Sequence, residues 1–357
     1  MTVKQSYKNG FYDDCDATTN WTPYKTIFLQ AGGYVSCIAG DVGKMVTDDA
    51  ANLGLLASYD NATRMWLVQT IVDVTVGSVM AITAGTGAGT SSAGLSTTFT
   101  CDGDIINLTG TPGNTNNEYA FIRKDISNIS TDTYPIALIK WRTNTSSNGM
   151  QALITFNYTA GTKQVTLGFS TNMNWQVNKI TLDASKTLDS IDLTMDDNPD
   201  SLVAGTSSVY IDWIIVCAGI FTYPHVAPGD IHLHFPKKKA QIPIFGRNGD
   251  ILQDGKLGSP TITINGNVLP GETWRASTSD PHFDYFIRGL LTDTVSYFSC
   301  DQPGIRGLVM YDDFEPIMHT SGNEADLRWQ LAFTLYKLGD FSNFADWGWM
   351  YNEESGF

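Results

Sequence analysis

The chain has 357 residues, of which 42% are hydrophobic and 11% aromatic, so it is long enough for two or three globular domains and too apolar for a disordered protein. Its formal net charge of −15 argues against a nucleic-acid groove, which needs clustered lysines and arginines. The opening sequence MTVKQSYKNGFYDD lacks the apolar core of a signal peptide, and no stretch approaches the length of an apolar membrane span, so we expect no membrane association.

The five cysteines, Cys15, Cys37, Cys101, Cys217 and Cys300, are scattered along the chain without a CxxC pair. Their odd number and irregular spacing fit neither a zinc site nor a disulfide framework. We therefore expect buried free thiols, formed in a reducing compartment.

Residues 1–23 and 97–222 are predicted to form one jelly-roll β-sandwich. MQALITFNYTAG and KQVTLGFSTN alternate apolar with polar residues, which is the period of half-buried strands, and SVYIDWIIVC does so with a more apolar end. The opening GFYDDCDATTNWT and the closing SSVYIDWIIV resemble the first and last strands of carbohydrate-binding modules and galactose-binding-like domains. The resemblance implies that these two strands lie near one another, so that a segment inserted between them leaves the sandwich intact.

Three aromatic residues of this segment are candidate glycan-binding residues: Trp141, Tyr158 and Trp175. Flat aromatic faces stack well on the C–H surfaces of sugars. The same residues also suit packing in the core or on a strand face, and both interpretations stay open.

Acidic residues near the ends of the predicted sandwich suggest a structural Ca²⁺ site, because carboxylate oxygens are the ligands that this ion prefers. Asp13, Asp14 and Asp16 lie near the opening strand and Asp212 lies in the closing one. Asp14 and Asp212 are the candidate ligands, and the resemblance implies that such a site is common in related sandwiches. A solvated acidic turn is the alternative, and we expect no other cofactor.

Residues 24–96 are predicted to form a small inserted β-domain. SYDNATRMWLV is typical of a hairpin with an Asp-Asn turn, and the pattern resembles small β-modules of tail-fibre and other virion proteins. The segment ends in TAGTGAGTSSAG, whose composition predicts a flexible linker.

Residues 226–341 are predicted to form a second domain, a β-barrel with one short helix, and residues 342–357 a C-terminal tail. Gly246, Arg247, Gly249 and Asp250 lie in a glycine-rich segment that lacks the GxxxxGK[ST] pattern of a phosphate-binding loop and precedes a strand. We predict a structural turn in which Arg247 and Asp250 pair locally or across a subunit boundary. The sequence DPHFDYFIRGLLTD places apolar residues on one helical face and predicts a helix over 280–293.

This third segment resembles the β-barrel domain of tailed-phage distal tail and baseplate hub proteins. The resemblance rests on KKKAQIPIFGRNGDILQDGKLGSPTITINGNVL, the helix, and VMYDDFEPIMHTSGNEADLRWQLAFTLYKLGD, in that order. It implies a domain that builds an oligomeric ring through contacts between subunits. The chain departs from the pattern by placing the sandwich before the barrel.

The favoured hypothesis is a structural virion protein of a tailed virus, a distal tail or baseplate component. Its barrel would form a homo-oligomeric ring, and its sandwich would contact other tail or baseplate proteins or a host-surface glycan. Assembly is expected in the host cytoplasm, and no specific nucleic-acid binding is expected. The alternative is a glycan-binding, adhesin-type module protein. GxSxG, HExxH and a cysteine with an evident histidine partner are all absent, so we predict that the protein is not an enzyme.

Overall fold

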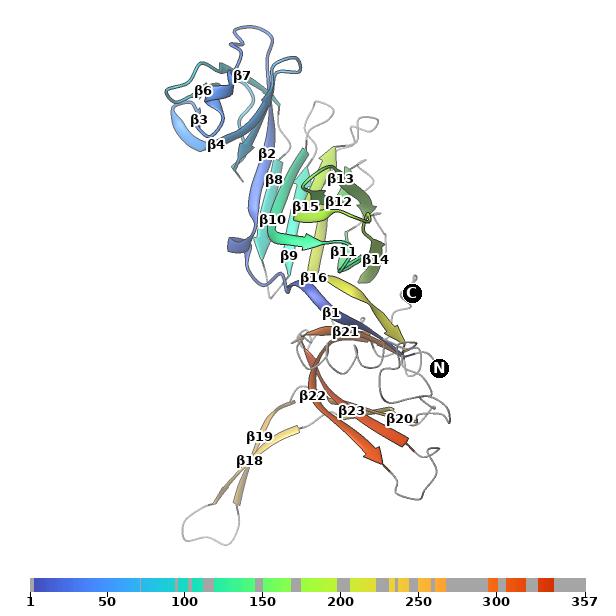
Figure 1. The fold of residues 1–357 in the computed structure, drawn as a ribbon. Coiled ribbons are helices and arrows are strands. Elements are labelled where there is room, and N and C mark those ends of the chain that lie inside the picture. The colour runs from blue at the N-terminus through green and yellow to red at the C-terminus, as the bar shows by residue number, and fades with distance from the viewer. Residues whose placement is uncertain are drawn as a thin grey trace. The chain divides into compact units, whose positions relative to one another are not determined.

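A computed structural model of the chain is mainly β, with antiparallel pairing in every strand pair whose register is defined (Figure 1). It divides into two compact units, one of Phe11–Ile215 and one of Met1–Gly10 with Val216–Glu353. The structure describes residues 3–70, 72–93, 96–101, 105–111, 119–144, 150–167, 175–197, 206–222, 231–234, 237–243, 250–257, 261–267, 295–300, 306–318 and 327–336.

The first sheet of the sandwich lies in the unit of Phe11–Ile215 and has the order β13-β12-β15-β10-β2. Its strands are β2 (Thr22–Leu29), β10 (Tyr119–Ser130), β12 (Met150–Tyr158), β13 (Thr162–Leu167) and β15 (Thr187–Asp197). Apolar side chains alternate along β10, β12 and β15 and define one buried face, and parts of the other face are buried as well, at Phe121, Leu153 and Asp192.

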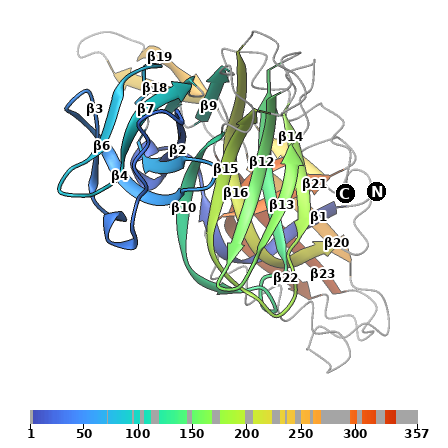
Figure 2. The same ribbon diagram turned by 90° about the horizontal axis from the view of Figure 1, so that it is seen from above.

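The opposite sheet has the order β14-β11-β16, and β9 pairs with both β16 and β8. These strands are β8 (Ser96–Cys101), β9 (Ile106–Thr111), β11 (Ile136–Thr143), β14 (Gln176–Thr181) and β16 (Ser207–Thr222). The antiparallel sheets give a sandwich-like arrangement (Figures 1 and 2), which agrees with the predicted sandwich of this segment.

Strand β2 also belongs to a closed ring of strands, in the order β2-β5-β4-β3-β6-β7 with β7 pairing back to β2. The other members are β3 (Met45–Asp48), β4 (Ala51–Asp60), β5 (Met65–Gln69), β6 (Val79–Ile82) and β7 (Ala88–Ala93). The predicted hairpin is β4 and β5, with Asp60 opposite Met65. Closing the ring removes exposed strand edges from this small module.

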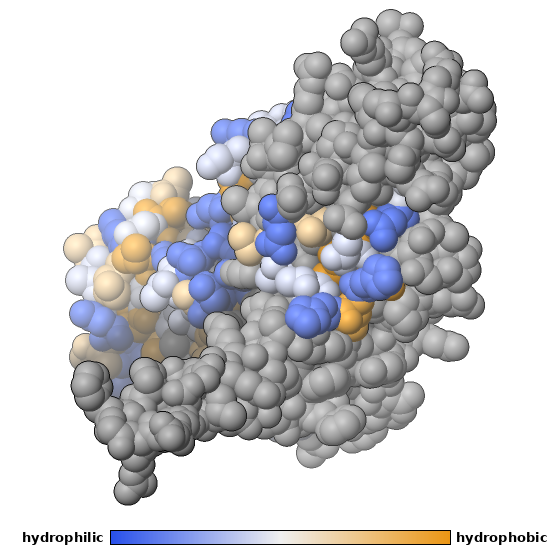
Figure 3. All heavy atoms as spheres, turned by 90° about the horizontal axis from the view of Figure 1, so that it is seen from below, coloured by the Kyte–Doolittle hydropathy of each residue, from blue (hydrophilic) through white to orange (hydrophobic). Residues whose placement is uncertain are grey.

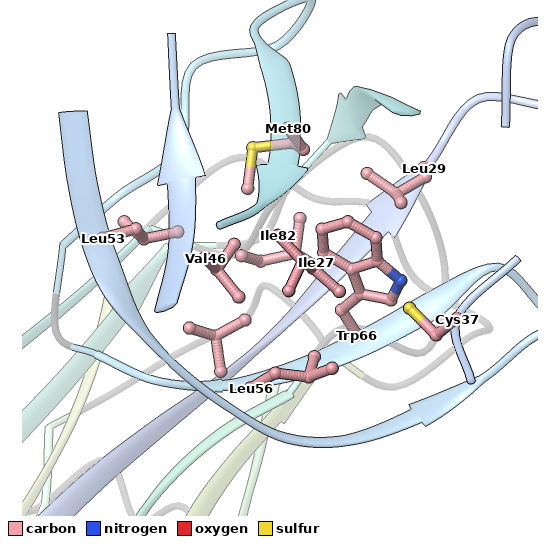
Figure 4. Packing of buried hydrophobic residues seen from close by; sticks show 10 residues of the cluster. Ile27, Leu29, Cys37, Val46, Leu53, Leu56, Trp66, Met80 and Ile82 are labelled. Carbon is pink, nitrogen blue, oxygen red and sulfur yellow. The ribbon is translucent and has the colours of Figure 1, made fainter. Parts of the chain in front are cut away.

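The ring has a core of its own, built around the fully buried indole of Trp66. Figure 4 shows side chains from several strands pointing into its interior, with Trp66 beside Ile27 and Cys37. The core residues are Ile27, Leu29, Cys37, Val46, Leu53, Leu56, Trp66, Val68, Met80 and Ile82. Burial raises the pKa of the Cys37 thiol to about 11, so this sulfur packs as an apolar group.

The prediction of a flexible linker in TAGTGAGTSSAG is wrong, because Ala88–Ala93 form strand β7. Glycine in this segment allows the backbone to pack closely against the core. A Cβ atom on Gly87 would lie 2.5 Å from the Cys37 sulfur and 2.7 Å from Ile82 Cδ1. The backbone can therefore approach the core only where side chains are absent.

The other unit contains the sheet order β1-β21-β22-β23-β20-β17 and a separate hairpin of β18 and β19. The strands are β1 (Val3–Asp13), β17 (Ile231–His234), β18 (Lys237–Pro243), β19 (Asp250–Leu257), β20 (Thr261–Asn267), β21 (Ser296–Cys300), β22 (Arg306–Met318) and β23 (Leu327–Tyr336). Residues 10–11 of β1 and 215–216 of β16 are the points where the chain passes from one unit to the other.

Several predictions for the C-terminal segment fall outside the described residues. These are the helix over 280–293, the tail of 342–357 and the residues Gly246, Arg247 and Gly249 of the predicted turn. Asp250 begins β19 and lies opposite Pro243 of β18. The described strands form an open sheet and a hairpin, and a barrel is not confirmed. The division of the chain into three modules and a tail stays a prediction.

Helices are short in the part of the chain that the structure describes, where we find the 3-10 turns η1 (Thr18–Asn20) and η2 (Ala39–Asp41). None of the described helices has the length and apolar character needed to cross a membrane. In the view of Figure 3, hydrophilic and hydrophobic residues alternate in small groups over the coloured surface. Cys15, Cys37, Cys217 and Cys300 are buried and Cys101 is half-buried, and all five are free thiols.

Candidate functional site

The three predicted sugar-stacking aromatics are buried and do not share one surface. Trp141 is 2% exposed in β11, Tyr158 is 6% exposed in β12 of the other sheet, and Trp175 is 6% exposed just before β14. The Tyr158 hydroxyl accepts a hydrogen bond from the Asp183 N–H at 3.1 Å. Their burial fits packing within the sandwich better than stacking on a sugar, and a role in glycan contact stays a prediction.

The acidic residues at the ends of the sandwich lie in polar contacts within the protein. Asp212 pairs with Lys140 at 2.8 Å, and Asp13 pairs with Lys124 and accepts the Cys15 N–H at 2.8 Å. Asp14 is half-buried. The described residues contain no group of three or more acidic, histidine or cysteine side chains placed to hold a metal ion. The structure therefore adds no ligand set to the Ca²⁺ prediction for Asp14 and Asp212.

The outward face of the sheet β13-β12-β15-β10-β2 brings together residues that sequence reasoning did not single out. Opposite residues of antiparallel strands point to the same side, so the registers define rows across the sheet. One row runs Gln164, Thr155, Asp192, Arg123 and Thr22. Strands are about 4.8 Å apart, so this row is about 19 Å long.

The next row, two residues along each strand, carries aromatic rings. Phe121 of β10 lies opposite Tyr24 of β2 and Thr194 of β15. The Tyr24 and Phe121 rings stack with centroids 4.8 Å apart and an interplanar angle of 16°. Tyr119 follows on β10, with its ring 6.3 Å from that of Phe121. Three rings from two strands thus form one aromatic strip, in which Tyr24 and Tyr119 are half-buried and Phe121 is buried, with 7% of its surface exposed.

A paired guanidinium and carboxylate border the aromatic strip. Arg123 Nε and Nη2 donate to the two oxygens of Asp192 at 2.7 and 2.8 Å, in the bidentate geometry that fixes both groups. The hydrogen bond to Asp192 raises the pKa of Arg123. The same guanidinium lies 5.5 Å from the Tyr24 ring centroid and 5.3 Å from that of Phe121.

The hydroxyls of this strip stay protonated near neutral pH. Burial raises the pKa of Tyr24, and burial followed by the nearby Asp196 carboxylate raises the pKa of Tyr119. Both residues therefore present a neutral O–H group that can donate and accept hydrogen bonds.

Neutral polar groups extend the face across β12, β13 and β15. Asn157 Nδ2 donates to Ser190 Oγ at 3.0 Å, and Gln164 Nε2 donates to Thr155 Oγ1 at 3.4 Å. The inward side of the same strands carries buried apolar residues such as Ile122. The face thus combines apolar rings with fixed and neutral hydrogen-bonding groups, which is the chemistry that a hydroxylated, uncharged ligand requires.

A signal for this face is present in the sequence. In YAFIR, residues 119–123, the larger aromatic and charged residues Tyr119, Phe121 and Arg123 alternate with Ala120 and Ile122, the pattern of a strand with one apolar face. The partner residues Tyr24 and Asp192 are 97 and 69 positions away from Phe121 and Arg123, respectively. Only strand pairing brings them together.

No protein-family model matches the chain, and no curated protein matches it. Among solved structures, the glycoside hydrolase domain of Endo-D from Streptococcus pneumoniae R6 aligns at 11% identity and a TM-score of 0.28, over 65% of this chain and 32% of that one. The family 11 carbohydrate-binding module of cellulase Lic26A-Cel5E from Clostridium thermocellum aligns at 14% identity and a TM-score of 0.24, over 35% of this chain and 83% of the module.

The same type of module from Clostridium thermocellum, solved with a β-1,3-1,4-mixed-linked tetrasaccharide, aligns at 14% identity and a TM-score of 0.26, over 61% of this chain and 98% of the module. The aligned part of this chain spans about a third of the Endo-D domain structure. These comparisons describe a distant structural similarity to a carbohydrate-binding module and a glycoside hydrolase domain. Similarity at this level says nothing about which ligand this chain binds.

Proposed function

We propose that the protein binds an uncharged polysaccharide on the outward face of the sheet β13-β12-β15-β10-β2. The observation that carries this proposal is the strip of Tyr24, Phe121 and Tyr119 beside the Arg123–Asp192 pair. Sugar rings offer apolar C–H faces together with a periphery of hydroxyl groups, and the strip offers the half-buried rings of Tyr24 and Tyr119 beside a fixed ion pair.

The electrostatics of the strip favour a neutral ligand. Arg123 and Asp192 neutralise each other, and their bidentate hydrogen bonds hold both groups in place before any ligand arrives. The row of about 19 Å across the strands suits an extended chain of sugars better than a single one. A polymer also gains affinity from several weak contacts along its length.

Replacing Tyr24 tests this proposal. Tyr24→Ala removes a half-buried stacking surface at the edge of the strip, and we expect at least a tenfold loss of affinity for the polysaccharide that the wild type binds. Tyr24→Phe keeps the ring and should retain most of the affinity. Binding is measured by affinity electrophoresis and calorimetry on a panel of neutral polysaccharides that includes mixed-linkage β-glucan.

Tyr210→Ala is the matched control, because Tyr210 belongs to β16 of the opposite sheet and should leave neutral-polysaccharide binding unchanged. Equal loss of binding in Tyr24→Ala and Tyr210→Ala would contradict the proposed site. Failure of the folded wild type to bind any polysaccharide of the panel would contradict the proposed function.

We propose as a second role that the unit containing β17–β23 forms a homo-oligomeric ring in the tail or baseplate of a virus. The supporting observation is the hairpin of β18 and β19, which pairs with no third strand among the described residues. A two-stranded hairpin is marginally stable by itself, and its free edges suit pairing with another subunit. The order of sequence elements that resembles distal tail proteins supports the same role.

A further inference from the structure

The outward face of the opposite sheet carries an arginine whose surroundings differ from those of Arg123. Arg142 lies in β11, and its guanidinium carbon is 4.7 Å from the Trp175 ring centroid and 4.8 Å from the Tyr210 ring centroid. Trp175 precedes β14 and Tyr210 belongs to β16, the two strands that flank β11. The guanidinium is therefore held between two aromatic rings from neighbouring strands.

This guanidinium has no anionic partner in the described part of the chain. Arg142 Nε is buried and has no hydrogen-bond acceptor, and the salt bridges of the described residues do not include Arg142. An unsatisfied donor in a buried position costs free energy, and a ligand that supplies an acceptor would remove this cost. Arg123 differs in this respect, because its Nε and Nη2 both donate hydrogen bonds to Asp192.

The charges around Arg142 leave a local excess of positive charge. Lys140, two residues earlier on the same face, lies 5.2 Å from the Trp175 centroid, but Asp212 neutralises it at 2.8 Å. Among the described residues of this cluster, Arg142 is therefore the cation without an anionic partner. The chain as a whole has a net charge of −15 and therefore repels anions in general. A positive site on this face would attract them locally.

Neighbouring groups on this face are neutral and polar. Asn107 of β9 lies opposite Tyr210, and Thr109 lies opposite Ser208 with its hydroxyl 2.6 Å from the serine hydroxyl. Amide and hydroxyl groups of this kind match the hydroxyls of a saccharide.

We propose that Arg142, held between Trp175 and Tyr210, is the binding site for the carboxylate or sulfate group of an acidic saccharide. The planar guanidinium suits bidentate contact with an oxyanion, and the two rings fix its orientation. This site lies on the opposite sheet from the neutral-polysaccharide strip, and it does not depend on that proposal.

The test compares binding of the full chain to polygalacturonate, dextran sulfate and uncharged dextran by calorimetry at constant ionic strength. We expect binding to at least one of the two polyanions and none to dextran. The carboxylated and sulfated polymers identify which oxyanion is preferred. Arg142→Gln should weaken polyanion binding at least tenfold, whereas Lys179→Gln, which removes the same charge from an exposed position of β14, should change it less than twofold.

Arg142→Lys guards against a folding defect, because it keeps the charge and loses the planar donor pair. It should keep the wild-type circular dichroism spectrum and still bind polyanions several-fold more weakly. Tyr24→Ala should leave polyanion binding unchanged, which separates this site from the neutral one. Equal losses in Arg142→Gln and Lys179→Gln, wild-type affinity in Arg142→Lys, or no polyanion binding by the wild type would each overturn the proposal.

Discussion

Asp41 connects two loops of the small ring module through one buried carboxylate. It accepts hydrogen bonds from the N–H groups of Ile38 and Thr86 at 3.0 and 3.2 Å and from the Thr86 hydroxyl at 2.7 Å. Lys44 lies 3.3 Å away. The Ile38 N–H is the main cause that holds the pKa of Asp41 far below its usual value of 3.8, with Thr86 and Lys44 adding to it against the effect of burial.

The lowered pKa makes the contribution of Asp41 to stability depend on pH. A carboxyl group with a depressed folded pKa stabilises the fold at pH values above its unfolded pKa, and this contribution is lost as the pH falls below that value. Asp41→Asn should therefore lower the Tm of the ring by several degrees at pH 7, and the difference from wild type should shrink below about pH 4. Thermal unfolding by circular dichroism between pH 2.5 and 7 measures this, and a constant difference would contradict the assignment.

Lys25 is a buried cation, 2% exposed in β2, and it pairs with Asp73, whose side chain is 46% exposed. Burial lowers the pKa of Lys25, and the hydrogen bond and charge of Asp73 oppose this effect. Asp73 Oδ1 also accepts the Thr97 N–H at 3.1 Å. The pair thus joins β2 to the segments on either side of β6 and β7.

We expect substitutions of the two partners, Asp73 and Lys25, to differ in how much they lower the free energy of unfolding. Asp73→Asn keeps an acceptor for Thr97 but leaves a buried ammonium group uncompensated, so we expect a loss of roughly 2–4 kcal/mol in the free energy of unfolding. Lys25→Met replaces the buried cation by an apolar side chain of similar length and should cost less than about 1.5 kcal/mol. Urea unfolding of the two variants measures the order, and equal losses would contradict this explanation.

At the scale of elements, β7 illustrates how close packing overrides composition. Its segment is rich in Gly, Ser and Thr, yet it pairs with both β2 and β6 and closes the ring. The backbone passes over Trp66 at Gly87, where an added Cβ would lie 3.1 Å from Trp66 Cζ2. A glycine that gives flexibility in an unpaired segment here gives close approach.

Gly87→Ala should destabilise the ring by about 1–3 kcal/mol, because the new methyl group overlaps the Cys37 sulfur and Ile82. Gly40→Ala is the matched control, since nothing lies within 4 Å of the position of its Cβ. Chemical unfolding followed by tryptophan fluorescence compares the two variants. A Gly87→Ala protein as stable as Gly40→Ala would show that the segment does not pack as described.

At the scale of the whole molecule, the chain is organised as two compact units, and strands β1 and β16 each run from one into the other. Each unit has its own buried residues, such as Trp213 in one and Tyr297 in the other. The proposed roles divide in the same way, with ligand binding in the unit of Phe11–Ile215 and self-association in the unit of β17–β23.

Self-association is tested by light scattering and negative-stain images of the full chain. We expect closed rings, because β18 and β19 pair with no third strand among the described residues, and unpaired strand edges suit pairing between subunits. A variant in which residues 237–257 are replaced by a short glycine-serine linker should be monomeric and should bind polysaccharide like wild type. A wild-type chain that stays monomeric at high concentration would contradict the ring.

The sequence by itself determined the β class of the fold and many of its strands, because the alternation of apolar and polar residues is a local property. The strand of residues 150–158, the hairpin around residues 60–65 and the closing strand that contains Tyr210 all follow from it. Burial of four of the five cysteines also follows from composition and spacing.

The tertiary structure alone decided which face each aromatic residue occupies and which residues meet. The sequence offers no reason to treat Trp141 and Trp175 differently. In the structure, Trp141 lies opposite Gln176, whereas the next residue of the same strand, Arg142, contacts Trp175. Tyr24 meets Phe121, and Arg123 meets Asp192, through the pairing of strands that are far apart in the chain. Periodicity determines which residues of one strand share a face, whereas the partner strand and its register depend on long-range packing.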